Sequence, residues 1–313
     1  MLVLGATGTI GQATVKALLG RGHEVVCAVR RPADTLAGAT VRLGNPTDPD
    51  WLSRVGIAGE HFDAVISCLA SRTGSPADAW AVDHDAQLVA LAAARQAQIP
   101  HFVLLSAICV QKPLLEFQRA KLAFEAALMA SGLTWSIVRP TAFFKSLSGQ
   151  VERVRQGKPF LMFGDGTLTA CKPISDRDLG LFLADCVTDP SRHNRILPIG
   201  GPGPAITPRD QGEALFRLLG QPPRFRRVPV GLLDGIIALL SLLGRVSPAL
   251  ARKADLARIG RYYATESMLV RDPVTGRYDA AATPETGDDL LFDYYRRLIA
   301  GEEKMALGDH AVF

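Results

Sequence analysis

Lys121 and Ser106 are the side chains that we predict to do chemistry. Ser106 ends the apolar run His101 to Ser106 (HFVLLS), and Lys121 lies in the helical segment that follows, Leu114 to Ser131. An ammonium group there can hold the hydroxyl groups of a bound ligand and stabilise negative charge, and a hydroxyl can donate or accept a proton. The structural alternatives are a solvated helix lysine and a strand-end hydroxyl that satisfies a loop.

The segment Met1 to Gly11 (MLVLGATGTIG) predicts where that ligand binds. An apolar strand is followed at once by Gly5, Gly8 and Gly11 and then by an apolar helical pattern. This order is typical of the first turn of a dinucleotide-binding unit. Gly5 permits the tight turn, Gly8 lets backbone amides approach a pyrophosphate, and Gly11 lets the helix lie close to the strand. The alternative is a strand–helix turn that binds nothing.

The second predicted strand, His23 to Val29, ends in Arg30 and Arg31. In NAD-binding units an acidic residue usually stands about 20 residues beyond the glycines and binds the ribose hydroxyl. Two guanidinium groups suit a 2′-phosphate instead, through charge-assisted hydrogen bonds. The sequence therefore predicts NADPH over NADH, the alternative being a solvated turn before Pro32.

Strands alternate with helices along the first half, which predicts an α/β fold with a Rossmann-type, doubly wound parallel sheet. After the first strand we predict strands at residues 23–29, 39–43, 63–68, 101–106 and 134–139, and helices at 76–98 and 114–131. Ligands of such sheets bind beyond the carboxyl ends of the strands. The predicted cofactor-binding residues are therefore Gly5, Thr7, Gly8, Thr9, Ile10, Gly11, Arg30, Arg31, Asn45, Ser67, Cys68, Leu69, Ser106, Lys121, Pro140 and Phe143.

Beyond residue 145 the alternation fades into turn-rich sequence. We predict an NADP-binding domain at residues 1–145 and a smaller, mixed α/β substrate-binding lobe at 146–313, with a possible exchange of strands between the two. Helical patterns remain at residues 176–187, 207–219, 232–243, 249–262 and 287–299. The apolar stretch Gly231 to Leu243 is shorter than the roughly 20 residues of a membrane span. It favours a core helix, with a pocket wall or an interfacial helix as alternatives.

Composition argues against several classes of function. The 313 residues are 48% hydrophobic and carry a net charge of +4, without a basic run, which argues against a nucleic acid partner. The cysteines are far apart and form no CxxC pair, so we predict free thiols in a reducing compartment and no metal site. They are Cys27, Cys68, Cys109, Cys171 and Cys186. Because the first strand begins at residue 1, we predict no targeting peptide and a cytoplasmic protein.

The opening motif and the strand order resemble the short-chain dehydrogenase/reductase superfamily. In that superfamily the helix after the fifth strand carries a Tyr-x-x-x-Lys pair, and the same segment here runs from Phe117 to Lys121 (FQRAK). The lysine is present, but Phe117 stands in place of the tyrosine. Without a phenol to protonate an alkoxide, the chain is poorly equipped to reduce a carbonyl. Reduction of a carbon–carbon double bond conjugated to a large π system develops no alkoxide.

Longer segments resemble the NADPH-dependent divinyl chlorophyllide 8-vinyl-reductases, atypical members of that superfamily close to its NmrA-like and isoflavone-reductase-like branch. The resemblance runs from Leu2 to the HAVF ending at His310 to Phe313 and suits a bacterial version. The segments that carry the resemblance are LLSAICVQKPLLEFQRAKLAFE (104–125), IVRPTAFFKSLSGQ (137–150), FGDGTLTACKPISDRDL (163–179), ILPIGGPGPAITPRDQGEALF (196–216) and YYATESMLVRDPVTGRYDAAATPETG (262–287).

This resemblance implies reduction of the 8-vinyl group of 3,8-divinyl chlorophyllide a, or of divinyl protochlorophyllide a, to ethyl in chlorophyll or bacteriochlorophyll biosynthesis. NADPH is the implied hydride donor, and peripheral contact with the photosynthetic membrane is possible. The tetrapyrrole needs an apolar slot, for which the expected substrate-binding residues are Phe143, Phe144, Lys145, Phe163, Tyr262 and Tyr263, with Phe160 as a further wall residue. Lys145, Lys172 or Arg177 could pair with the propionate. Core packing is the alternative for each aromatic residue.

Two other functions stay open at this point. An NmrA-like redox-sensing regulator would bind NADP without turnover, and the absent tyrosine favours it. A membrane-docked assembly factor on the same fold would use residues 232–243 as its anchor.

Overall fold

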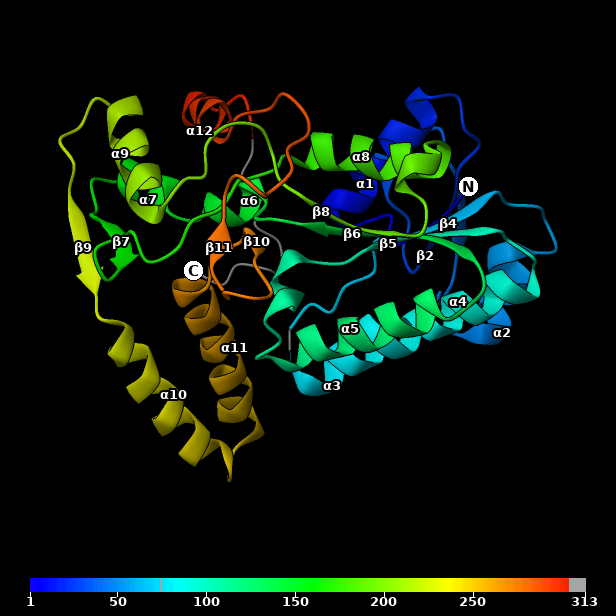
Figure 1. Ribbon diagram of the computed structural model, residues 1–313, viewed down its shortest axis with the longest axis horizontal. Coiled ribbons are helices and arrows are strands. Elements are labelled where there is room, and N and C mark those ends of the chain that lie inside the picture. Colours follow the sequence, from blue (N-terminus) through cyan, green and yellow to red (C-terminus); the bar gives the residue numbers. More distant parts are fainter. Residues whose placement is uncertain (74, 304–313) are drawn as a thin grey trace. The chain divides into compact units, whose positions relative to one another are not determined.

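The computed structural model describes residues 1–73 and 75–303, which fall into two compact units (Figure 1). The first unit comprises Met1–Ser71, Pro76–Pro140 and Asp176–Ile199, and the second holds the other described residues. The chain thus leaves the first unit close to the predicted boundary at residue 145. It returns for residues 176–199, which lie within the predicted substrate-binding lobe. The HAVF ending at 310–313 lies outside the described residues.

The described residues of the first unit form a seven-stranded parallel sheet in the order β3-β2-β1-β4-β5-β6-β8. This topology confirms the predicted doubly wound sheet, with strands slightly shorter than the sequence pattern indicated. The strands are β1 (Leu2–Leu4), β2 (Val26–Val29), β3 (Thr40–Leu43), β4 (Ala64–Ser67), β5 (His101–Leu105), β6 (Thr134–Pro140) and β8 (Arg195–Ile199).

Helices cover both faces of this sheet (Figure 1). On one face lie α1 (Thr9–Gly20) and α8 (Asp176–Thr188), which cross so closely that a Cβ on Gly180 would lie 2.6 Å from the backbone of Ala13. On the other face lie α2 (Pro49–Trp51), α3 (Pro76–Ala79), α4 (Ala86–Gln96) and α5 (Glu116–Met129). A π-helical turn, η3 (Trp80–Asp85), joins α3 to α4, so the predicted long helix contains a wider turn.

Strand β8 was not predicted, and its pairing explains why residues 176–199 return to the first unit. Its residues pair in parallel with β6, Ser136 opposite Arg195 and Pro140 opposite Ile199. The strand lies at the edge of the sheet, and its sequence, RILPI, is partly exposed and contains a proline. Such an edge strand lacks the buried apolar run by which the inner strands are recognised.

His101, in β5, makes the stability of the first unit depend on pH. Its side chain is 5% exposed and its Nε2 donates to Oγ of Ser136 at 3.1 Å, since that hydroxyl itself donates to the carbonyl of Arg192. Burial, and then the neighbouring His193, lower the pKa of His101 from 6.5 to about 4. Between these two pH values His101 is protonated in the unfolded chain but neutral in the folded protein. Stability is therefore lost as the pH falls.

Because of His101, we expect the free energy of unfolding to fall by up to about 3 kcal/mol as the pH is lowered from 6.5 to 4. His101→Gln should flatten this part of the pH profile, measured by denaturant unfolding at a series of pH values. His61→Gln, at an exposed position, is the control and should leave the slope unchanged. Equal slopes in wild type and His101→Gln would contradict this account.

The second unit has its own core. Its strands are β7 (Phe160–Phe163) paired in parallel with β9 (Phe225–Val228), and β10 (Val270–Arg271) paired with β11 (Tyr278–Asp279). Its helices are α6 (Phe144–Leu147), α7 (Val151–Arg155), α9 (Pro208–Leu218), α10 (Val230–Gly244), α11 (Pro248–Thr265) and α12 (Leu291–Ala300). Val154, Phe160, Phe216 and Tyr295 form the centre of its apolar cluster. The helices predicted at residues 207–219, 232–243, 249–262 and 287–299 are confirmed as α9 to α12, whereas α6, α7 and the short strands of this unit were not predicted.

The prediction of a core helix for Gly231–Leu243 is wrong. This stretch forms most of α10, and none of the residues of α10 is buried. A sequence pattern reveals that a helix is apolar, but not whether another element covers its outer face. No helix in the part of the chain that the structure describes is both long and apolar enough to cross a membrane.

Candidate active site

The glycine turn between β1 and α1 leaves space for a ligand at one of its three glycines. Gly5 has φ +73°, and a Cβ there would lie 2.6 Å from the backbone of Cys68. A Cβ on Gly11 would lie 2.2 Å from the Gly5 carbonyl oxygen. Gly8 differs, because its φ of −74° and ψ of 162° suit any residue and its Cβ would meet only Gly5 O at 3.4 Å. The fold itself thus needs glycine at positions 5 and 11 but not at 8.

Helix α1 presents an N-terminus suited to an anion. Gly8 is its N-cap and supplies no side chain, and the first turn, with Thr9 and Ile10, carries no acidic residue. The partial positive charge of the helix end is therefore not neutralised by the chain itself. The exposed backbone at Thr7 and Gly8 leads directly into this end, and the Gln12 side chain donates to the Thr7 carbonyl at 2.8 Å.

Arg30 and Arg31 follow β2 at the same edge of the sheet and are exposed. Among residues 1–73 and 75–303, neither guanidinium has a hydrogen-bond or ion-pair partner. Asn45, after β3, is also exposed, and its Oδ1 accepts from the amide and hydroxyl of Thr47 at 3.2 and 2.9 Å. An unpaired cationic pair beyond the glycine turn fits a phosphorylated dinucleotide.

The hydroxyl of Ser67, at the end of β4, already has a partner within the protein. Ser67 is fully buried and donates to Oε1 of Gln87 at 2.7 Å, which leaves its backbone for the predicted cofactor contact. Gln87 in turn donates to the carbonyl of Leu69 at 3.2 Å. Burial raises the pKa of the Cys68 thiol to about 12, so this cysteine is no nucleophile at neutral pH.

Lys121 is held by a buried carboxylate. Its Nζ lies 2.9 Å from Oδ1 of Asp83, whose other oxygen accepts from the hydroxyl of Ser71 at 2.6 Å. Asp83 lies in the π-helical turn η3, and Ser71 lies beyond the end of β4. The lysine therefore lies near the carboxyl end of β4, with one direction of its ammonium fixed. Phe117, one turn earlier on α5, offers no proton-donating group.

Ser106 belongs to a second buried network. Its hydroxyl donates to Glu125 of α5, and the guanidinium of Arg139 pairs with the same carboxylate. The amide of Ser106 donates to the carbonyl of Val138 at 2.7 Å. Because the hydroxyl proton is already given to Glu125, Ser106 can accept a hydrogen bond from a ligand more readily than donate one.

The structure thus joins each predicted catalytic residue to an acid that was not among the predicted site residues. Asp83 and Glu125 are both nearly inaccessible to solvent. The sequence signal that could have identified these two acids is a carboxylate inside an otherwise apolar stretch of helix. Such a carboxylate is buried and therefore needs a cationic or hydrogen-bonding partner. Sequence spacing does not reveal which cation that partner is.

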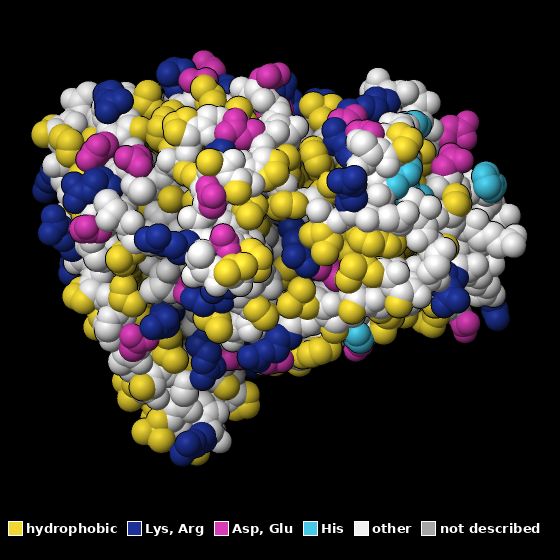
Figure 2. All heavy atoms as spheres, in the orientation of Figure 1, with side chains coloured by type: hydrophobic (Ala, Val, Ile, Leu, Met, Phe, Trp, Pro, Cys, Tyr) yellow, Lys and Arg dark blue, Asp and Glu magenta, His cyan; other side chains and the backbone are white. Residues whose placement is uncertain are grey.

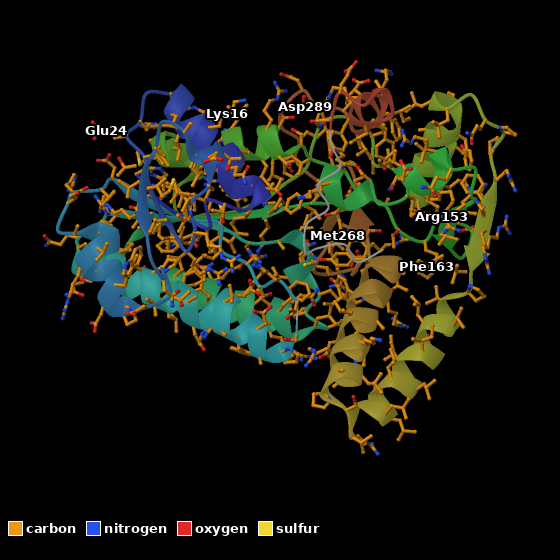
Figure 3. All side chains as sticks on the ribbon, turned by 180° about the vertical axis from the view of Figure 1, so that it is seen from behind. Lys16, Glu24, Arg153, Phe163, Met268 and Asp289 are labelled. Atoms are coloured by element: carbon orange, nitrogen blue, oxygen red, sulfur yellow. The ribbon has the colours of Figure 1, made fainter. Side chains whose placement is uncertain are left out.

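The predicted substrate residues Phe143, Phe144, Lys145, Phe163, Tyr262 and Tyr263 all lie in the second unit. Phe144 is buried against Tyr294, with ring centroids 5.7 Å apart, and the further wall residue Phe160 packs in the same core. Tyr262 is buried and meets the exposed Tyr263 edge to face. Phe143 is half-buried, as are Lys145 and Phe163, which ends β7 and is labelled in Figure 3.

The residues offered for the propionate differ in their charge partners. Lys172 is buried and paired with Glu285, so its charge is already satisfied. Arg177, at the start of α8, pairs with Asp178 at 3.0 Å and belongs to the first unit. Pro140, predicted to contact the cofactor, is the buried last residue of β6.

Comparisons with known proteins agree with this geometry. A family described as NAD(P)H-binding matches residues 5–190. The chloroplastic divinyl chlorophyllide a 8-vinyl-reductase of Cucumis sativus is 51% identical over 332 residues, covering 100% of this chain and 79% of the relative. That of Arabidopsis thaliana is 48% identical, covering 97% and 78%.

A solved NADPH-dependent quinone oxidoreductase from Escherichia coli, complexed with NADPH, shares the fold. Its TM-score is 0.69 at 17% identity, over 95% of this chain and 99% of that one. At this identity the likeness concerns the fold alone. The glycine turn, the NAD(P)H-binding match and the identity over the whole chain together place the protein in the divinyl chlorophyllide a 8-vinyl-reductase family.

Proposed function

We propose that this protein reduces the 8-vinyl group of divinyl chlorophyllide a, or of divinyl protochlorophyllide a, to ethyl, with NADPH as the reductant. The observation that carries the proposal is the identity of about half of all residues, over the whole chain, with relatives that bear this enzyme's name. Conjugation of the vinyl group to the macrocycle fits a site without a phenol, because addition of hydride to carbon creates no alkoxide to protonate.

Different residues of the first unit bind different parts of the coenzyme. The turn from Gly5 to Gly11 and the N-terminus of α1 bind the pyrophosphate, and Arg30 and Arg31 bind the 2′-phosphate. Lys121 binds the ribose hydroxyls. When bound, the reduced nicotinamide supplies a hydride to one vinyl carbon.

The other vinyl carbon must receive a proton, and Lys121 is the group of this chain that we propose to relay it from water. Asp83 keeps the ammonium in place for both roles through the 2.9 Å contact. In the second unit, Phe143 and Phe163 are half-buried and Tyr263 is exposed, and we propose that their rings stack on the flat macrocycle and that Lys145 pairs with the propionate.

Arg30→Ala combined with Arg31→Ala is expected to raise the KM for NADPH by about 100-fold and to change the KM for NADH little. The reason is that only NADPH carries the phosphate that these guanidinium groups would bind. Steady-state kinetics with both coenzymes measure the effect. The control is Arg54→Ala with Arg95→Ala, two exposed arginines elsewhere in the first unit. An equal loss with both coenzymes would assign the pair a structural role.

The proposed activity is tested by an anaerobic assay of purified protein with divinyl chlorophyllide a and either NADPH or NADH. We expect one NADPH oxidised per pigment reduced, together with the blue shift of the Soret band that follows loss of a conjugated vinyl group. Tight NADPH binding without oxidation would favour a redox-sensing regulator and overturn the proposal.

We also propose that the protein works as a peripheral protein at the photosynthetic membrane, on the cytoplasmic side. The support is the exposed apolar face of α10 and its length, which is below that of a membrane span.

A further inference from the structure

Helix α10 exposes one continuous aliphatic stripe. Leu232, Ile236, Leu239 and Leu243 follow one another at spacings of four, three and four residues, which places them on one helical face. Leu242 lies beside this stripe and Val246 continues it into the turn toward α11, with 58% and 86% of their surfaces exposed. The apolar surface is therefore continuous along the helix, unlike the scattered single residues that are ordinary on protein surfaces.

The opposite face of α10 packs on α11, so the two helices form a hairpin. A Cβ on Gly244 would lie 2.9 Å from the backbone of Ala251, which shows how closely they approach near the turn. At the other end of the hairpin Asp234 pairs with Arg261 at 2.5 Å. The contact with α11 thus uses one side of α10 and leaves the aliphatic side exposed.

The hairpin and the strand before it are strongly basic. Residues 224–261 contain eight arginine or lysine residues and two aspartates, a net charge of +6 against +4 for the whole chain. Both aspartates are paired with arginine, Asp255 with Arg258 at 2.7 Å. In the described part of the chain Arg226, Arg227, Arg245, Arg252 and Lys253 have no acidic partner and are exposed. Figure 2 shows hydrophobic side chains along the hairpin and a basic side chain at its tip.

We propose that the α10–α11 hairpin docks on the surface of an anionic lipid bilayer, with the aliphatic stripe in the acyl boundary and the unpaired basic residues at the lipid headgroups. The 15 residues of α10 are too few to span a bilayer but suit a helix lying in the interface. A second copy of the chain fits less well, because its hairpin would bring the same positive charge to the contact.

This inference deepens the proposed function and rests on it only for the pigment-bearing nature of the membrane. Vesicle binding is measured without pigment or coenzyme, so failure of the docking and failure of the reductase activity are separate results.

The test is sedimentation of the purified full-length protein with vesicles of phosphatidylcholine alone, or with 30% phosphatidylglycerol, at low and high salt. We expect binding to the anionic vesicles that weakens at high salt, and at least about tenfold weaker binding to neutral ones. Leu239→Asp with Leu242→Asp should lower binding to anionic vesicles by about tenfold or more.

The matched control is Leu168→Asp with Val274→Asp, which places two acids at exposed apolar positions of the second unit outside the hairpin and should bind like wild type. Arg245→Gln with Arg252→Gln removes two of the five unpaired basic charges and should reduce the salt dependence. Equal sedimentation of the hairpin and control variants would overturn the proposal. So would a dimer in light scattering that the Leu239/Leu242 variant abolishes, since the stripe would then bind a second copy.

Discussion

Replacing Gly8 by alanine is expected to weaken NADPH binding by about 10- to 100-fold while the protein stays folded. The backbone at Gly8 has angles open to alanine, and the added methyl group would meet only Gly5 O at 3.4 Å. The free energy of unfolding of the Gly8→Ala variant should therefore differ from that of the wild type by less than about 1 kcal/mol. The methyl group would instead occupy the space through which the backbone amides reach the pyrophosphate. Calorimetric titration with NADPH and denaturant unfolding measure the two effects.

Two other glycines of the same helix give contrasting controls. Gly11→Ala should destabilise the protein by about 2–4 kcal/mol, because the new Cβ would lie 2.2 Å from Gly5 O. Gly20→Ala has no atom within 4 Å of the new Cβ and should leave NADPH affinity unchanged. If Gly8→Ala bound NADPH as tightly as Gly20→Ala does, the pyrophosphate would not lie against this turn.

Replacing Lys121 by methionine is expected to lower kcat by about 100- to 1,000-fold. The ammonium is proposed to hold the ribose and relay the proton, and methionine keeps the length of the side chain without the charge. The same change leaves the buried Asp83 without its cation, which costs about 3–5 kcal/mol of stability. Both single-turnover measurement of pigment reduction and thermal unfolding are needed, because a loss of stability alone would also lower the measured rate of reduction.

The double variant Lys121→Met with Asp83→Asn separates the two causes. Removing both charges of the pair should restore most of the stability but not the turnover. Asp83→Asn alone should lower kcat less than Lys121→Met does, since the ammonium remains but loses its fixed direction. Lys16→Ala, at an exposed position on α1 (Figure 3), is the control and should change neither quantity. Turnover within twofold of wild type in the double variant would remove Lys121 from the mechanism.

The sequence by itself determined the features that depend on neighbouring residues. The strand, the glycine turn and helix α1 lie within the first 20 residues, so local backbone geometry specifies them. The inner strands and the longer helices follow from apolar runs and helical periodicity in the same way. The general preference for right-handed connections determines on which face of the parallel sheet each connecting helix lies.

The tertiary structure alone decided which distant residues meet. Asp83 and Lys121 are 38 positions apart in the sequence and come together because the turn η3 and helix α5 pack on the same face of the sheet. Glu125 meets Arg139 only because β6 returns beside β5. The sequence indicated a possible exchange of strands between the two domains, but it did not show that residues 176–199 are the part that returns to the first unit, nor that one face of α10 is open. A sequence pattern shows which side chains are apolar or charged but not which element lies against them.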